Sequence, residues 1–185
     1  MTRLALVSFL LASPFALAES PFRDSGVYVG AYGGAHFPVD AWAMGSAAEG
    51  PTQLDDGGVI GVRVGGAFLR YVGLEMNLGL VAVETRDGDR VHVADFATAV
   101  WGQLDAGPIA VQGRFGLGLY GTGDGEVGAD ADWNTHLGIG VKYAINDRFT
   151  VRFDARHTFA DGIEDTAHVF EMAFGVDVWV WPWTR

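Results

Sequence analysis

Ten charged residues have the types and spacing to form ion pairs with one another inside a folded sheet. Five are basic and five are acidic, and all but Arg156 are flanked on both sides by apolar residues or glycine. They are Arg63, Glu75, Asp95, Arg114, Lys142, Arg152, Asp154, Arg156, Glu171 and Asp177. A buried ion without a partner costs several kcal/mol, so a balanced set of charges suits a closed interior network. Register arithmetic around a loop near Ile163 places Arg156 opposite Glu171, which predicts one such pair.

Catalytic chemistry is not indicated by the remaining polar residues. The serines all lie outside the predicted strands: Ser8, Ser13, Ser20, Ser25 and Ser46. No serine is therefore aligned as a nucleophile with His36, His136 or His157. The glycine-rich residues 30–34 lack the Lys-Ser/Thr pair and the following helix of a phosphate-binding loop. We predict no catalytic residue, no cofactor and no enzymatic activity.

Metal binding is considered for one acidic segment and for the histidines. Residues 124–132, DGEVGADAD, cluster carboxylates that could bind Ca²⁺. They lack the closing Glu of an EF-hand loop, which favours a solvated acidic loop. The five histidines fall mostly at strand ends or in loops, and no pair of them shows ligand spacing. We predict no metal centre, and divalent cations are candidate partners of the acidic loops alone.

The elements that position these charges are strands. In residues 57–85, alternate positions carry bulky aliphatics, while the positions between them carry glycine together with Arg63 and Glu75. A soluble sheet places its aliphatics inside and its charges in water. The opposite arrangement predicts a barrel with an apolar outer band facing lipid and a polar lumen, so the ten charges form a lumen charge network. Strands of about 10 residues suffice to cross a membrane when tilted.

Read with a period of two, the chain yields eight candidate strands. They are residues 27–37, 58–68, 72–83, 93–104, 109–120, 133–144, 149–158 and 169–181. Tight connections at 69–71, 105–108 and 145–148 alternate with long ones at 38–57, 84–92, 121–132 and 159–168. Short periplasmic turns and longer outer loops are typical of outer-membrane barrels. We predict an all-β fold, an eight-stranded antiparallel up-and-down transmembrane β-barrel. A secreted soluble barrel of the lipocalin type is the rival, and it requires apolar residues at the charged positions.

The first residues have the features of an export signal. Residues 1–18 contain a basic start at Arg3, an apolar run from Leu4 to Ala12 and an A-x-A site ending at Ala18, which predicts a cleaved signal peptide. Residues 19–185 are then one outer-membrane barrel domain. The chain has no cysteine, so an exported form gains no stability from disulfides.

The charge distribution bears on partners. The formal net charge is −11, and because the lumen charges balance, the surplus acid falls on the four long connections. An acidic outer rim repels anions, gathers divalent cations and argues against nucleic acid as a partner. A salt-adapted host would favour the same acidity, and the sequence does not separate the two.

Aromatic residues gather at strand ends and predict two girdles at the membrane surfaces. The outer girdle comprises Phe37, Trp42, Trp133, Phe159 and Phe170. The periplasmic girdle comprises Phe68, Tyr71, Tyr143, Phe149, Trp179, Trp181 and Trp183.

The chain resembles the small outer-membrane β-barrel proteins of Gram-negative bacteria, namely the OmpA-type transmembrane domain and its opacity and porin-family relatives. The similar segments are residues 26–37 (GVYVGAYGGAHF), 73–75 (GLE), 138–145 (GIGVKYAI) and 152–157 (RFDARH). The resemblance implies a bacterial outer-membrane location, with membrane lipid, lipopolysaccharide and the outer-membrane assembly machinery as partners. It also implicates Glu75 in a lumen salt-bridge network with Arg63, Lys142 or Arg152. No peptidoglycan-binding domain is expected after Arg185.

Three roles are compatible with the sequence. We predict a structural or surface-interaction role, with the lumen plugged by a salt-bridge network, as expected at eight strands. The first alternative is a narrow pore or uptake route for a small solute, apolar solutes included, for which the glycine-rich inner faces would leave space. The second alternative is an adhesin that acts through the acidic outer loops.

Overall fold

The computed structural model describes residues 22, 25–39, 42–44, 52–85, 88–123, 129–160 and 166–181. The predicted signal peptide and most of the acidic segment 124–132 lie outside the described residues. The strands are β1 (Gly26–Pro38), β2 (Ala43–Met44), β3 (Thr52–Leu69), β4 (Val72–Thr85), β5 (Arg90–Ala106), β6 (Ile109–Thr122), β7 (Asp130–Ala144), β8 (Phe149–Ala160) and β9 (Ala167–Trp181). No described helix is long and apolar enough to cross a membrane.

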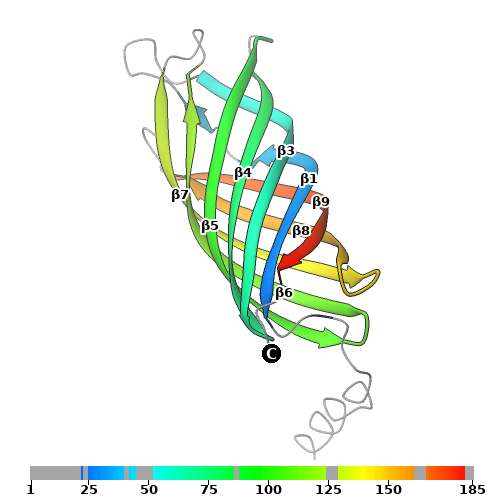
Figure 1. Ribbon diagram of the computed structural model, residues 1–185. Helices are drawn as coiled ribbons and strands as arrows, with labels where there is room; N and C mark the ends of the chain where they lie inside the picture. The colour runs from blue at the N-terminus through cyan, green and yellow to red at the C-terminus, as the bar shows by residue number, and fades with distance from the viewer. Residues whose placement is uncertain are drawn as a thin grey trace, which may run out of the picture.

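Eight of these strands close into an antiparallel barrel, as predicted. Each pairs with its neighbour in sequence, and β1 pairs with both β3 and β9, which closes the sheet. The two-residue β2 pairs only with the start of β3. Figure 1 shows the tilted strands around the barrel, with the β4–β5 hairpin in green projecting at the top.

The two ends of the barrel differ. The three tight turns, the start of β1 and the end of β9 share one end, which we call the turn end. The turn between β5 and β6 contains Gly107, whose φ of 62° lies in the left-handed region that glycine tolerates best. The opposite end, where β2 lies, is called the loop end.

All four predicted long connections at the loop end are shorter than expected, because the strands extend further toward that end. The β4–β5 connection is a tight hairpin, because pairing continues to Glu84 and Arg90, and the Thr85 amide donates to the Asp89 carbonyl at 2.8 Å. β3 likewise begins at Thr52, so the first connection is cut short. The predicted loop at 84–92 is wrong because the inward–outward alternation of the two strands continues into it. Val83 and Val91 face inward and are buried.

The two faces of the sheet have the polarity predicted for a transmembrane barrel. Outward aliphatics are exposed, as in Ile60 at 65% and Leu78 at 55%, whereas the inward Arg63 and Glu75 are each 2% exposed. The outward residues form a continuous apolar band that a soluble protein would cover. The lipocalin-type rival is therefore excluded.

Side chains of different chemistry occupy successive levels of the lumen. Charged residues lie at the middle levels, and an apolar cluster that includes Trp42, Val59, Val81 and Tyr120 lies toward the loop end. At the turn end, one cluster contains Tyr28, Ala67, Trp101 and Trp179, and another contains Phe22, Ala110 and Ala144.

Two of the residues predicted for the aromatic girdles point into the lumen instead of toward the membrane. Trp42 is fully buried and its ring lies 5.0 Å from that of Tyr120 inside the barrel. Trp179 is 9% exposed and lies 5.0 Å from the ring of Tyr28. Trp179 has the same parity as Asp177, so it points inward. The side chains of Trp181 and Trp183 lie outside the described residues.

Candidate functional site: the charged lumen

Glu75 on β4 is held by side chains from three other strands. Arg152 on β8 donates from Nη1 to Oε2 at 2.6 Å and from Nη2 to Oε1 at 2.9 Å, which makes the pair bidentate. The Tyr28 hydroxyl on β1 donates to Oε2 at 2.6 Å, and Arg114 on β6 reaches Oε1 at 3.5 Å. Alternation places all four side chains inward, although their strands are far apart in sequence.

Two further carboxylates connect this group to Arg63. Arg63 donates from Nε to Asp177 Oδ1 at 2.6 Å and from Nη1 to Asp154 Oδ2 at 2.9 Å. Asp154 also accepts from Arg152 Nε at 2.7 Å, and from Arg114. Each guanidinium therefore contacts at least two carboxylates. The central network has three cations and three anions, namely Arg63, Arg114, Arg152, Glu75, Asp154 and Asp177.

A second group of charges lies nearer the loop end. Arg156 donates from Nη2 to Asp95 Oδ2 at 2.5 Å and to Glu171 Oε2 at 2.8 Å. The Arg156 and Glu171 positions are opposite each other in the β8–β9 register, as the hairpin arithmetic predicts. His36 Nδ1 lies 3.6 Å from Glu171 Oε2, and its ring packs beside Trp42.

Lys142 differs from the other nine charged residues. Among the residues that the structure describes, no carboxylate forms an ion pair with it. Its Nζ contacts Gln103 Oε1 at 3.3 Å and lies 4.5 Å from the ring centroid of Trp101 and 5.6 Å from that of Tyr28. A cation over an aromatic face is stabilised by the ring quadrupole. Lys142 therefore belongs to the aromatic level at the turn end, and the predicted pairing with Glu75 falls to Arg152.

The space opposite the inward glycines is occupied by long side chains. An added Cβ at Gly65 would meet the Tyr28 ring, and one at Gly61 would meet the Tyr32 ring. Between the two charged groups lies a cavity of about 10 Å³, lined by residues that include Tyr32, Arg63 and His136. That volume is close to the minimum for one water molecule.

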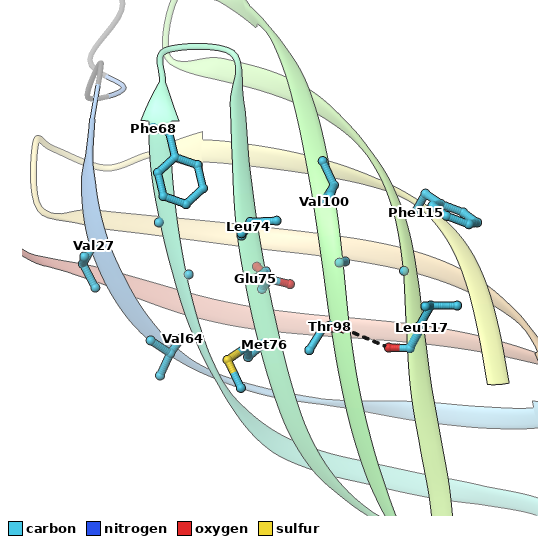
Figure 2. A pocket seen from close by; sticks show the side chains of 14 residues that line it. Val27, Val64, Phe68, Leu74, Glu75, Met76, Thr98, Val100, Phe115 and Leu117 are labelled. Atoms are coloured by element: carbon cyan, nitrogen blue, oxygen red, sulfur yellow. Dashed lines mark hydrogen bonds between the residues drawn. The ribbon is translucent and has the colours of Figure 1, made fainter. Parts of the chain in front are cut away.

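The outer wall carries a shallow apolar groove across β3 to β6. Its volume is about 540 Å³, and Phe68, Leu74, Val100 and Phe115 project around it in Figure 2. Thr98 interrupts this apolar surface, and its hydroxyl donates to the Leu117 carbonyl at 3.3 Å. The polar group is thereby paired within an apolar surface, as a membrane requires.

Ser25, the one serine within the described ranges, is not brought next to His36. Ser25 precedes β1 at the turn end, whereas His36 lies near the other end of the same strand. No group of three or more His, Asp or Glu side chains within the described ranges is arranged to hold a metal ion.

Two groupings in the structure were not anticipated from the sequence. One is the interior aromatic level, which the parity of Trp101 and Trp179 would have indicated. The other is the pair His157 and His168 on the outer wall, whose ring nitrogens lie 3.3 Å apart. The register that pairs Arg156 with Glu171 also brings these histidines together.

Comparison with known proteins identifies the family. The model of the outer membrane protein beta-barrel domain matches residues 3–177. This chain belongs to that family. The family and the barrel place it in the bacterial outer membrane, so the turn end is periplasmic and the loop end is outside. A search of the curated proteins gives no significant match.

Solved structures of outer-membrane barrels share this fold. The N-terminal barrel domain of Pseudomonas aeruginosa OprF is 16% identical, covers 84% of this chain and 98% of its own, and has a TM-score of 0.56. Neisserial surface protein A is 14% identical with a TM-score of 0.59, and covers 84% of this chain and 99% of its own. OprG from Pseudomonas aeruginosa is 11% identical with a TM-score of 0.58, and covers 88% of this chain and all of its own. These similarities confirm the predicted fold.

Proposed function

We propose that this outer-membrane β-barrel has a structural or surface-interaction role, with its lumen closed to solutes by side chains. The observation that carries the proposal is the filling of the interior. The cavity between the two charged groups holds about 10 Å³, whereas sites for small molecules usually have about 300–1,000 Å³.

The chemistry of the central network supports a permanent closure. Its three guanidinium groups and three carboxylates balance, and the side chains of Arg152, Glu75 and Asp177 are at most 3% exposed. Removing one partner from a buried ion pair costs about 3–5 kcal/mol. A solute passing through this level would have to separate several such pairs at once.

The levels beyond the charges add further barriers. Trp42 and Tyr120 lie on the outer side of the Arg156 group, while Tyr28, Trp101 and Trp179 lie on the periplasmic side of the central network. The glycine-rich faces that favour a pore in the sequence are covered by tyrosine rings in the folded barrel. This arrangement supports closure over the pore alternative.

The outer wall fits a lipid environment. Its exposed aliphatics and the 540 Å³ groove are apolar, and we propose membrane lipid and lipopolysaccharide as the molecules in contact with them. Delivery by the outer-membrane assembly machinery is part of the same proposal.

Single-channel recording tests the closure. The folded barrel is reconstituted in planar bilayers as wild type, as Glu75→Ala and as Glu84→Ala, the last being an exposed control on the same strand. Folding is checked by circular dichroism and by the heat-modifiable gel shift. We expect no discrete current steps from wild type. Steps in wild type that change in Glu75→Ala but not in Glu84→Ala would overturn the proposal and establish a pore.

A further inference from the structure

Two histidines from neighbouring strands meet on the outer wall near the loop end. His157 of β8 and His168 of β9 approach through Nε2 and Nδ1, which lie 3.3 Å apart. Their ring centroids are 5.4 Å apart, and Phe159 packs against both rings at 4.6 and 5.2 Å. They come from directly hydrogen-bonded strands, with His157 opposite Phe170 and His168 opposite Phe159, so the two histidines are diagonal neighbours on the wall.

The surroundings leave the imidazoles few other partners. The cross-strand neighbour of His157 on β7 is Leu137, and its neighbour on β9 is Phe170. Both rings are half-buried among these apolar side chains. The two ring nitrogens contact each other, and the cross-strand neighbours of His157 offer it no polar side chain.

The nitrogen separation matches a shared metal ion. Two imidazole nitrogens bound at about 2.0–2.1 Å to one tetrahedral ion lie roughly 3.3–3.4 Å apart. Without a metal ion the two ring nitrogens are within hydrogen-bond distance, one donating to the other according to the tautomer, and a bound ion would replace that hydrogen bond. We propose that His157 and His168 form a two-histidine site for a borderline divalent metal ion, Zn²⁺ or Cu²⁺, on the outer wall.

The choice of ligand atoms distinguishes binding at this site from the general attraction of cations to the acidic loops. Neutral imidazole suits Zn²⁺ and Cu²⁺, whereas Ca²⁺ and Mg²⁺ take oxygen ligands. The two histidines supply two positions, and oxygen atoms from water complete the coordination. A net charge of −11 raises the local concentration of every cation, whereas the histidine pair favours Zn²⁺ and Cu²⁺.

Metal titration of the untagged, folded barrel in detergent tests the proposal. CuCl₂ and ZnCl₂ are added to wild type, His157→Gln, His168→Gln and His92→Gln, and binding is followed by calorimetry. His92 is the matched control, an exposed outward histidine on β5. We expect one Cu²⁺ or Zn²⁺ per chain, and each variant of the pair should weaken binding by more than about tenfold, since even an outer partner of a metal-bound imidazole contributes that order. His92→Gln should bind like wild type.

Two results would overturn the site. One is the absence of a specific Cu²⁺ or Zn²⁺ event in wild type, or an equal response to CaCl₂. The other is wild-type binding in both variants of the pair. Electron paramagnetic resonance of the Cu²⁺-loaded wild type requires no variant to fold, and it should report two equatorial nitrogens. A signal from oxygen ligands alone would refute the proposal.

Discussion

Glu75→Ala should be among the most destabilising single changes in this barrel. The carboxylate accepts three hydrogen bonds of 2.6 to 2.9 Å, two from Arg152 and one from Tyr28. Hydrogen bonds to charged groups contribute about 1.5–3 kcal/mol each, but they overlap with the ion pair and do not add. Removing one partner of a buried pair costs about 3–5 kcal/mol, and we expect that loss in the free energy of unfolding.

The measurement is reversible urea unfolding in lipid vesicles, followed by tryptophan fluorescence. Glu84→Ala is the control, because Glu84 lies on the same strand but is 59% exposed, and its pair with Arg90 should contribute less than about 1 kcal/mol. Glu75→Gln separates charge from volume, since it keeps the size and an acceptor oxygen. Equal losses in Glu75→Ala and Glu84→Ala would refute the reasoning. Wild-type stability in Glu75→Gln would assign the loss to packing instead of charge.

The same assay tests two further predictions. Lys142→Met should change the unfolding free energy by less than about 1.5 kcal/mol, because the lysine has no described carboxylate partner and methionine has a similar volume. Arg152→Met should lower the unfolding free energy by about 3–5 kcal/mol. Similar effects of the two substitutions would contradict the difference between these cations. Gly65→Ala should cost about 1–3 kcal/mol because the new Cβ meets the Tyr28 ring. Gly113→Ala, with nothing within 4 Å, should stay within about 0.5 kcal/mol of wild type, and a ranking opposite to this would contradict it.

The fold could be predicted because a period of two fixes which side of a strand each residue occupies. Eight alternating segments and tight turns sufficed for the strand count, and the parity of Arg63 and Glu75 gave the polarity of the wall. The errors in the strand bounds lie at the loop end. The sequence predicts a loop at Glu84 and Arg90, but both residues continue the β4–β5 pairing with their side chains exposed. Charge alone does not distinguish a loop from a strand that extends into water.

The site was less accessible to sequence reasoning. Register arithmetic gave the Arg156–Glu171 pair because those strands are joined by a hairpin. It did not give Arg152–Glu75, whose strands are not neighbours in the sheet. The girdle prediction for Trp42 is wrong because strand parity does not extend into a connecting segment. Such contacts depend on how far side chains reach across the lumen.

The reach of these side chains also determines what lies opposite the inward glycines. Gly30 is opposite Asp177 on one neighbouring strand and opposite Arg63 on the other, and a Cβ added there would meet both side chains. At Gly175, an added Cβ would meet Arg63 and Tyr32. Long charged residues thus cross the lumen where glycine makes room for them. A glycine-rich inner face predicts a pore only if no long side chain points toward it, and here the ion pairs and the glycines form one packing arrangement.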